Sequence, residues 1–457
     1  MIDLTLREIQ EVTSGKLLSK APDTLIGGLC TDSRTIAPGQ VFVAIKGANF
    51  DGHDFVAEAA AKGAQALILE RDTIPELSRK VDHIIIVDDA LSAMSKIAAE
   101  IRQRVFIPVV GVTGTNGKTT VKEILAHLLS SRYKTLASRK SYNNIIGLSL
   151  TLFELDGSYD AAVLEMGTNH PGEIRRLAEI ARPDIGIITN IGNGHLESFG
   201  DRRGVFSEKT SLLDVLPSDG AAFLNKDDDL LTGAACRVER KFFGISEGSD
   251  FLISGISAFA GGSDFFLNGK KFSVPLEGVH NVYNASAAIA AAWHLGVSDL
   301  EIGENLRAIS PPAMHLERVS VGGFAFINDS YNANPNSFDS ALQVLQDSPS
   351  TGKKVVVAGS MKELGRSSGM FHRMLGRSIA ERKLDLLITL GDEARSIIEG
   401  ALESGMSGDR VHCAKNHEDA ASIIKNIAGP DPLILLKGSR AARMEEVLRC
   451  FTISCTR

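Results

Sequence analysis

The chain has 457 residues, of which 44% are hydrophobic and 23% are charged, and its formal net charge is −7 at pH 7. This composition is that of an ordinary globular protein, and a prior of about 150 residues per domain predicts roughly three domains. A net acidic chain gives no electrostatic case for binding nucleic acid, although a local basic pocket for an anionic substrate stays compatible with it.

The sequence gives no sign of a membrane protein or a secreted protein. The N-terminal sequence MIDLTLREIQ has no basic segment followed by an apolar core, so we expect no signal peptide. The alanine-rich stretch 285–295 is shorter than the about 18 residues of a membrane span. The five cysteines form no Cys-x-x-Cys pair, which favours reduced thiols. We therefore expect a cytoplasmic protein without membrane insertion and without a nucleic-acid partner.

Residues 1–105 predict a small α/β domain that precedes the nucleotide site. Short apolar runs alternate there with amphipathic stretches, as strands alternate with helices in an α/β unit. The runs expected as strands are 41–45, 66–69 and 84–87, and the stretches expected as helices are 55–62 and 90–104.

The next stretch, VVGVTGTNGKTTVKEIL at 109–125, predicts a phosphate site. An apolar run at 107–112 indicates a buried strand, and a glycine-rich turn leads from it into a helix. Glycines let the backbone approach phosphate oxygens, and N–H groups of the turn and of the helix N-terminus point inward. Lys118 is expected to bridge the terminal phosphates and Thr119 to bind Mg²⁺ through its hydroxyl. The residues expected to bind the nucleotide are Gly114, Thr115, Asn116, Gly117, Lys118, Thr119 and Thr120.

This loop departs in one place from the generic pattern Gly-x4-Gly-Lys-Ser/Thr. Val112 stands where that pattern requires glycine, and Gly111 lies one residue early. A glycine-rich turn without a nucleotide is the alternative interpretation, but Gly117 followed by Lys118 favours the phosphate site. The departure therefore does not reject the phosphate site, but it restricts the families of nucleotide-binding proteins to which the loop can belong.

Residues 106–313 predict a doubly wound, mostly parallel sheet around this loop. Glu165 closes an apolar run at 161–165, and a carboxylate at the carboxyl end of a neighbouring strand is placed to bind Mg²⁺ or orient water. His195 follows the next run, 185–189, and is a candidate for a second Mg²⁺, although an isolated loop histidine is more often a surface or capping residue. Lys209 by itself indicates only a solvated helix lysine.

Two further segments complete the predicted domain order. A glycine-rich, strand-like excursion at 241–278 precedes the alanine-rich helix, and Pro311-Pro312 marks a boundary. Residues 314–457 then predict a third α/β domain, Rossmann-like and with a parallel sheet. Its expected strands are 324–328, 354–358, 386–390 and 433–437.

Over essentially its whole length the chain resembles the Mur ligases. The loop TGTNGKTT and the segment HNVYNA at 280–285 are shared by that superfamily, which includes the folylpolyglutamate synthases. The segments YNNIIG at 142–147, DSYNANP at 329–335 and MKELG at 361–365 resemble the members that add D-alanyl-D-alanine to UDP-N-acetylmuramoyl-tripeptide. The resemblance implies three α/β domains and an ATP-dependent ligation through an acyl phosphate, with release of ADP and phosphate. We expect a monomer.

The resemblance assigns the nucleotide and metal residues. Lys118 and Arg318 would stabilise the phosphates, while Thr119, Glu165 and His195 would bind two Mg²⁺. Lys209 corresponds to the lysine that relatives carry as a carbamate, N6-carboxylysine, whose added carboxylate supports metal binding. Asn281 would contact adenine, and Arg318 and Asp329 would reach the ATP phosphates and ribose when the domains close. The implied catalytic residues are Lys118, Glu165, His195, Lys209 and Arg318.

The resemblance also assigns the substrate residues. Domain 1–105 would hold the UDP-sugar, domain 106–313 ATP, and domain 314–457 would close over ATP and bind the dipeptide. The implied residues are Ser33 and Arg34 for the UDP-sugar, Asn143 and Asn144 for the tripeptide end, and Asn332, Asn334 and Ser337 for the dipeptide.

One departure and two alternatives stay open. Relatives have Gly-Asp-Met where this chain has Gly359-Ser360-Met361, so residue 360 supplies no site acid. The first alternative is a ligase that adds another amino acid or extends a glutamate tail, although the Asp-Asn-Pro-Arg motif of the relatives that add diaminopimelate or lysine is not found. The second is a nucleotide-binding subunit without ligase chemistry. The sequence leaves open whether the third residue of the tripeptide is lysine or diaminopimelate, and which base accepts the amine proton.

Overall fold

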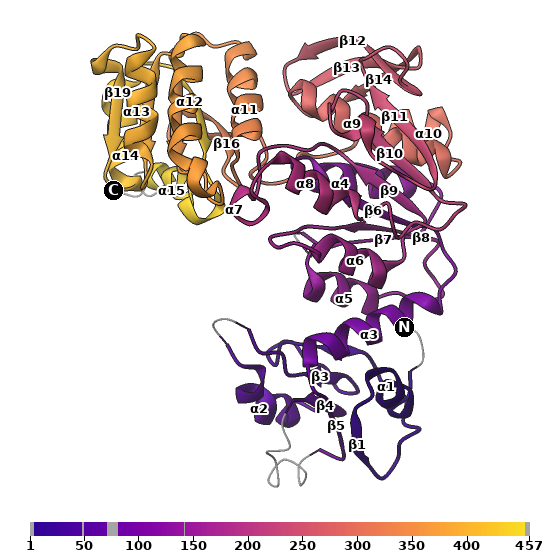
Figure 1. The fold of residues 1–457 in the computed structure, drawn as a ribbon. Helices are drawn as coiled ribbons and strands as arrows, with labels where there is room; N and C mark the ends of the chain where they lie inside the picture. The colour runs from indigo at the N-terminus through magenta and orange to yellow at the C-terminus, as the bar shows by residue number, and fades with distance from the viewer. Residues whose placement is uncertain (1–3, 48–49, 71–80, 141, 453–457) are drawn as a thin grey trace.

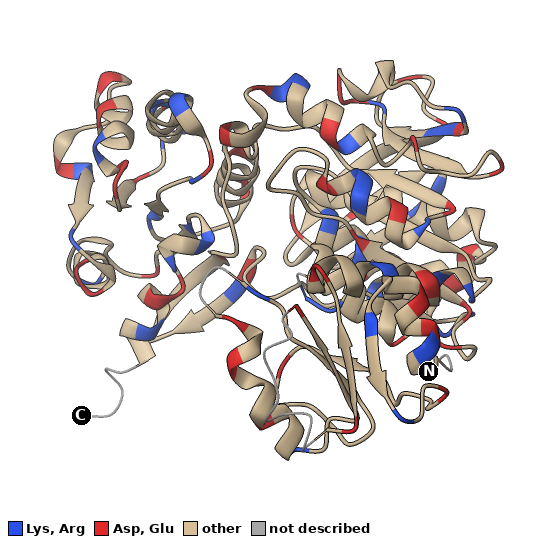
Figure 2. Ribbon diagram, turned by 60° about the horizontal axis from the view of Figure 1, so that its bottom comes forward, with Lys and Arg blue, Asp and Glu red and all other residues tan. Residues whose placement is uncertain are grey.

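Three sheets follow one another along the chain in the computed structural model, which describes residues 4–47, 50–70, 81–140 and 142–452 (Figure 1). No helix in these ranges is long and apolar enough to cross a membrane. Figure 2 shows acidic and basic residues interspersed over the helices around all three sheets.

The first sheet has five strands in the order β1-β5-β4-β3-β2, and only β1 runs antiparallel to its neighbour. The expected strands are present, and the expected helix 55–62 is observed as α2, which directly follows a 3₁₀ turn, η1. A capping box of Thr5 and Glu8 begins the first helix. The elements are α1 (Leu6–Thr13), β1 (Lys16–Ser19), β2 (Leu29–Cys30), β3 (Val41–Val43), η1 (Gly52–Phe55), α2 (Val56–Ala61), β4 (Ala66–Leu69), β5 (His83–Ile86) and α3 (Ala90–Gln103).

Helix α3 joins this unit to the central one. Its apolar face shares one hydrophobic core with the central helices α5 and α6 (Figure 1). The buried guanidinium of Arg102 donates hydrogen bonds to the carbonyl oxygens of Ala181 (2.9 Å) and Arg182 (3.1 Å). Burial lowers the pKa of Arg102 from its usual value.

The central sheet has nine strands in the order β14-β13-β12-β11-β10-β9-β6-β8-β7. It is parallel from β7 to β12, and β13 and β14 continue it in antiparallel pairing, so the strand-like stretch 241–278 extends the sheet first with parallel and then with antiparallel strands. The elements are β6 (Val109–Thr113), α4 (Lys118–Leu129), β7 (Thr135–Ala137), α5 (Ile145–Phe153), β8 (Ala161–Glu165), α6 (Glu173–Ala181), β9 (Ile185–Ile188), α7 (Leu196–Phe199), α8 (Arg202–Thr210), β10 (Ala221–Asn225), η3 (Leu231–Gly233), β11 (Glu239–Gly244), β12 (Phe251–Phe259), β13 (Gly262–Leu267), β14 (Lys270–Val274), α9 (Val279–His294) and α10 (Asp299–Arg307).

Strand β6 lies between β8 and β9, and all five of its residues are buried. Continuous apolar burial is typical of a parallel strand covered by helices on both faces. The carboxyl ends of β6, β8 and β9 therefore meet at one edge, where such sheets bind ligands. The prediction that Glu165 ends a strand next to the phosphate-loop strand is confirmed.

The third sheet has six strands in the order β15-β16-β20-β17-β18-β19. The four expected strands are present as β16, β17, β18 and β20 and pair in parallel. A further strand, β15, forms an antiparallel hairpin with β16, and its turn, Gly322-Gly323, has positive φ at both residues. The elements are β15 (Glu317–Val321), β16 (Phe324–Asp329), α11 (Pro335–Asp347), β17 (Lys354–Gly359), η4 (Gly365–Ser367), α12 (Ser368–Glu381), β18 (Leu386–Leu390), α13 (Ala394–Glu403), η5 (Gly408–Arg410), β19 (Val411–Ala414), α14 (His417–Ile427), β20 (Leu433–Lys437), η6 (Arg440–Ala442) and α15 (Glu446–Thr452).

Candidate active site

A cavity of about 1030 Å³ lies where the central and third sheets face each other. The phosphate loop, the segments after β8, β9 and β10, and the start of α9 line its central side. The segment after β16, together with α11 and α12, lines the other side. The expected site residues among its lining are Thr115, Asn116, Gly117, Lys118, Thr119, Thr120, Asn143, Asn144, Glu165, His195, Asn281, Asp329, Asn332, Asn334 and Ser337.

The phosphate loop has the conformation that its glycines predict. Gly114 and Gly117 have φ of +144° and +83°, and a Cβ at Gly117 would lie 2.2 Å from Oδ1 of Asn284. Helix α4 begins directly after Gly117, and the Lys118 ammonium donates to the carbonyl oxygens of Gly114 (3.0 Å) and Thr115 (3.1 Å). Burial lowers the pKa of Lys118, and the nearby Glu165 opposes that shift. The loop thus presents backbone N–H groups and one ammonium to the cavity.

Glu165 is 1% exposed, and among the described residues its carboxylate accepts hydrogen bonds from uncharged side chains only. The hydroxyl of Thr119 donates to its Oε2 (2.8 Å), and the amide of Asn143 donates to its Oε1 (2.8 Å). Carboxylate and hydroxyl oxygens are the ligands that Mg²⁺ prefers. Thr119 and Glu165 therefore fit one Mg²⁺, with Asn143 holding the carboxylate in place.

The other two residues expected to bind a metal, His195 and Lys209, differ in their position relative to the cavity. His195 lines the cavity, but imidazole is not a preferred Mg²⁺ ligand. Lys209, near the end of α8, is 1% exposed and is not part of the cavity lining. Burial and then the charge of Lys118 hold the pKa of the Lys209 amine well below its usual value. The prediction from composition that Lys209 is a solvated lysine is wrong.

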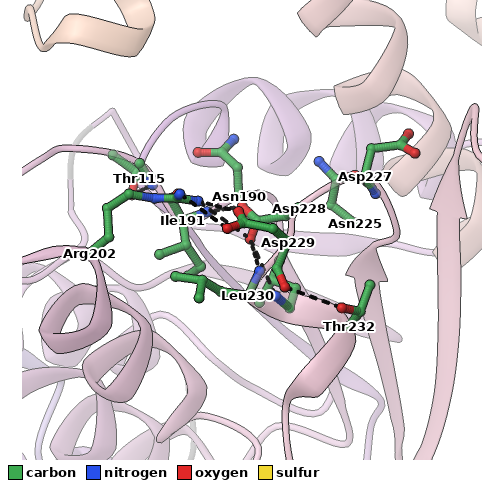
Figure 3. Close-up of polar contacts among 12 residues, drawn as sticks. Thr115, Asn190, Ile191, Arg202, Asn225, Asp227, Asp228, Asp229, Leu230 and Thr232 are labelled. Carbon is green, nitrogen blue, oxygen red and sulfur yellow. Dashed lines mark hydrogen bonds and ion pairs between the residues drawn. The ribbon is translucent and has the colours of Figure 1, made fainter.

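The segment after β9 is fixed from two sides (Figure 3). The backbone N–H of Asn116 donates to Oδ1 of Asn190 (3.0 Å), which ties the segment to the phosphate loop. The backbone N–H of Ile191 donates to the buried carboxylate of Asp228 (2.6 Å), and burial raises the pKa of that carboxyl group. Arg202 pairs with the adjacent Asp229 (2.6 Å). These contacts hold the backbone that leads to His195.

The start of α9 and the end of β16 form the wall of the cavity beside the phosphate loop. The Asn281 amide donates to the carbonyl of Glu277 (2.8 Å) and its oxygen accepts from Asn284 (3.0 Å). Asp329 is bound by the buried ammonium of Lys437. Burial lowers the pKa of His280, next to this pair, to about 4, so its ring is neutral at pH 7.

Five expected site residues do not line the cavity: Gly114 and Lys209, described above, and Arg318, Ser33 and Arg34. The guanidinium of Arg318 is bound to Glu277 (2.7 Å), and neither residue is part of the cavity lining, so a contact with ATP would require this pair to open. Ser33 is buried and donates to Glu58 (2.9 Å), and the exposed Arg34 pairs with Asp32 (2.7 Å), both in the first unit. Their expected roles stay predictions.

The segment Asn332–Ser337 reaches the phosphate loop. Asn334 caps α11 by accepting from the backbone N–H of Ser337 (2.9 Å), and its amide nitrogen donates to Oδ1 of Asn116 (2.7 Å). The amide of Asn116 donates back to Oδ1 of Asn334 (3.2 Å). Asn144 likewise caps α5 by accepting from Gly147 (2.9 Å). Asn334, Ser337 and Asn144 therefore have structural hydrogen bonds in addition to any contact with substrate.

Sequence reasoning missed two cavity residues, His315 and Glu363. His315 stacks on Tyr331 with ring centroids 4.6 Å apart, and its Nδ1 lies 2.9 Å from the carbonyl oxygen of Ala313. Burial lowers the pKa of His315, so its ring is neutral and its Nδ1 carries the proton. Glu363 lies 2.6 Å from Nδ1 of His195. Ser360 is buried outside the cavity lining and accepts from the backbone of Glu393 (3.3 Å).

Comparisons with protein families match nearly the whole chain. The family models describe a Mur ligase middle domain at 112–292, a Mur ligase glutamate ligase domain at 316–440, and a Mur ligase family catalytic domain at 25–102. Curated relatives named UDP-N-acetylmuramoyl-tripeptide–D-alanyl-D-alanine ligase are 35% identical in Bacillus subtilis and 35% identical in Escherichia coli. Each alignment covers 98% of this chain and 98% of the relative.

Solved structures agree with these relatives. MurF from Acinetobacter baumannii superimposes with a TM-score of 0.90 at 33% identity, over 98% of both chains. MurF ligase from Thermotoga maritima in complex with ADP has a TM-score of 0.82 at 30% identity, over 93% of this chain and 96% of that one.

Proposed function

This chain belongs to the Mur ligase family, and from that premise we propose that it joins D-alanyl-D-alanine to UDP-N-acetylmuramoyl-tripeptide with hydrolysis of ATP. The products are the UDP-linked pentapeptide precursor of peptidoglycan, ADP and phosphate. The observation that carries the proposal is one cavity shared by the phosphate loop and the Asn332–Ser337 segment. A ligase needs this arrangement, because the activated carboxylate and the incoming amine must meet at the ATP γ-phosphate.

The first step transfers the γ-phosphoryl group of ATP to the terminal carboxylate of the tripeptide. Both reactants are anionic, so the site must neutralise charge and align them. The loop amides and the Lys118 ammonium bind the phosphates, and Asn143 lies at the cavity edge next to Glu165, where the carboxylate would enter. The new bond joins a carboxylate oxygen to phosphorus, and ADP leaves.

The second step is attack of the dipeptide amine on the acyl phosphate, which expels phosphate. The amine must be un-ionised, because an ammonium has no lone pair. The third unit contributes Asn332 and Tyr331 to the cavity and contacts the phosphate loop through the Asn116–Asn334 pair. Contact between the two units keeps water away from the acyl phosphate, which would otherwise hydrolyse.

The residues that would hold Mg²⁺ are Thr119 and Glu165, with His195 and a carbamate on Lys209 at a second position. When bound, Mg²⁺ neutralises the developing charge on the transferred phosphoryl group. Burial lowers the pKa of the Lys209 amine, which favours the un-ionised amine, and it is the un-ionised form that is nucleophilic toward carbon dioxide; this supports carbamate formation at Lys209. The carbamate turns an amine into an anion next to the phosphate loop.

We further propose that the enzyme acts in the cytoplasm as a monomer. The alternative ligases are tested together with the main proposal. The purified chain is incubated with ATP, Mg²⁺, the UDP-linked tripeptide and D-alanyl-D-alanine, while phosphate release and product mass are followed. Phosphate that appears only with both co-substrates, together with a UDP-linked pentapeptide, supports the proposal. Ligation of a free amino acid in place of the dipeptide would contradict it, as would ATP binding without ligation. Parallel reactions with the lysine and diaminopimelate tripeptides determine the third residue.

A further inference from the structure

A short turn before β15 holds His315 in the cavity, next to the segment that carries the residues expected to bind the dipeptide. The backbone N–H of Tyr331 donates to the carbonyl oxygen of Met314 (3.2 Å), and that of Leu316 donates to Oδ1 of Asp329 (3.2 Å). Met314 and Leu316 have φ of +59° and +53°, a left-handed conformation that residues other than glycine adopt only at an energetic cost. Such strain collects at functional sites, so the turn points to a function of the residue between these two.

The ring of His315 is held in one tautomer. It stacks on Tyr331 with ring centroids 4.6 Å apart, and its Nδ1 lies 2.9 Å from the carbonyl oxygen of Ala313. A carbonyl oxygen only accepts hydrogen bonds, so Nδ1 donates and the lone pair of a neutral ring lies on Nε2. In the part of the chain that the structure describes, no hydrogen bond to Nε2 is found, and the residue lines the cavity. His315 therefore offers the cavity a proton acceptor whose ring is fixed by the stack and by the Ala313 contact.

The groups around this ring leave it un-ionised at neutral pH. Burial lowers the pKa of His315, and the ammonium of Lys437 adds to this shift, while the Ala313 contact and the carboxylates of Asp329 and Glu165 oppose it. The three charged groups stand at the ends of β20, β16 and β8, so the ring lies within electrostatic reach of both the third and the central sheet. An un-ionised imidazole in this place can accept a proton.

Among the described residues, two other histidines line the cavity, and both belong to the central unit. His280 lies in the first turn of α9, and burial lowers its pKa to about 4, which makes its ring a weak base at pH 7. His195 follows β9, where its Nδ1 lies 2.6 Å from Oε2 of Glu363. Of the three, only His315 belongs to the unit on which the dipeptide amine is expected to bind.

We propose that His315 is the base that accepts the proton of the dipeptide amine in the second step. This inference rests on the proposed function for the reaction, and on the observed turn and tautomer for the choice of residue. The un-ionised amine forms a C–N bond with the acyl carbon, and the C–O bond to the phosphate breaks with its electron pair on the departing phosphate. One N–H proton passes to Nε2, because the nitrogen becomes acidic as it forms its fourth bond. The imidazolium then returns the proton to the released phosphate or to water.

The test separates the two steps of ligation with hydroxylamine. Hydroxylamine is un-ionised at pH 7 and attacks an acyl phosphate without a base, so the formation of hydroxamate from ATP and the UDP-linked tripeptide measures the first step alone. The variant is His315→Phe, which keeps a ring to stack on Tyr331 but has no lone pair to accept a proton. It should form hydroxamate as fast as the wild type does. Its formation of pentapeptide should fall about 10²–10⁴-fold, the range of general acid–base catalysis.

The pH dependence gives a signature that a structural role would not give. The deficit of His315→Phe should shrink as the pH is raised from about 7 to about 9, because hydroxide then takes over the proton transfer. The matched control is His412→Asn, since His412 lies in β19 of the same unit and outside the cavity lining. It should change neither rate.

Normal formation of pentapeptide in His315→Phe would overturn the proposal. An equal loss of hydroxamate and pentapeptide in both His315→Phe and His315→Gln would overturn it too, because it would place the residue in the first step. Wild-type protein that forms neither product would reject the proposed function, and this inference with it.

Discussion

Replacing Lys209 should stabilise the protein while inactivating it. The Lys209 side chain is 1% exposed, and no hydrogen bond or ion pair of its amine is found among the described residues. A buried polar group without a partner costs about 1–3 kcal/mol of folding free energy. Lys209→Met removes the amine and keeps an unbranched apolar chain, so it should recover most of that cost.

The expected gain can be measured by calorimetry in buffer depleted of carbon dioxide, where Lys209 carries no carbamate. For a unit of about 200 residues each kcal/mol raises Tm by roughly 2–4 °C, so Lys209→Met should unfold several degrees above the wild type. Turnover should fall to background in the same variant. A lower Tm would refute the reasoning, because it would mean that the amine makes a stabilising contact.

A second variant at this position tests the carbamate. Lys209→Ala should be almost inactive, and a short carboxylate such as acetate should restore part of the turnover by entering the space left by the side chain. Fully active Lys209→Ala would remove the carbamate from the mechanism.

Three further changes test other parts of the account. Lys118→Ala should abolish turnover and weaken ATP binding in calorimetric titration. The control is Lys134→Ala, at an exposed lysine that donates to Ser158, which should change neither quantity. Near-normal turnover of Lys118→Ala would reject the phosphate site. Lys437→Met leaves the Asp329 carboxylate buried without its charged partner, so it should lower the free energy of unfolding by about 3–5 kcal/mol. Adding Asp329→Asn should recover most of this loss. An unchanged Tm of Lys437→Met would show that the pair is not needed for stability. The pKa of His280 is about 4 in the folded chain, so between pH 6.5 and 4 only the unfolded chain binds this proton and stability falls as the pH falls. In His280→Asn the free energy of unfolding, measured with urea, should fall less between pH 6.5 and 4 than it does in the wild type. An equal fall in both proteins would contradict the lowered pKa of His280.

The parts of the site that were predictable depend on neighbours in sequence. The phosphate loop combines a buried strand, glycines at positive φ and a helix N-terminus within residues 109–125, and each of these leaves a local signal. Glu165 was predictable because the end of one parallel strand lies beside the end of the next. The family resemblance supplied the rest of the metal and substrate residues.

The parts that were not predictable depend on contacts between distant segments. The Asn116–Asn334 pair joins residues 218 positions apart, and the His195–Glu363 pair joins two units. The direction of Arg318 follows from strand alternation, since neighbouring side chains of a strand point to opposite faces. In β15 this places Arg318 against Glu277, while His315, just before the strand, enters the cavity. His315 precedes the strand, and the left-handed backbone at Leu316 (φ +53°) separates it from the alternation of β15, so the strand pattern could not place it.

The central claim, ligation through an acyl phosphate, is tested most directly by following oxygen. The tripeptide is labelled with ¹⁸O in its terminal carboxylate and converted with ATP and D-alanyl-D-alanine, and the released phosphate is analysed by mass spectrometry. The mechanism predicts one ¹⁸O atom in each phosphate, because the carboxylate oxygen that attacks phosphorus leaves with it. Phosphate without ¹⁸O would contradict the acyl phosphate and the account built on it.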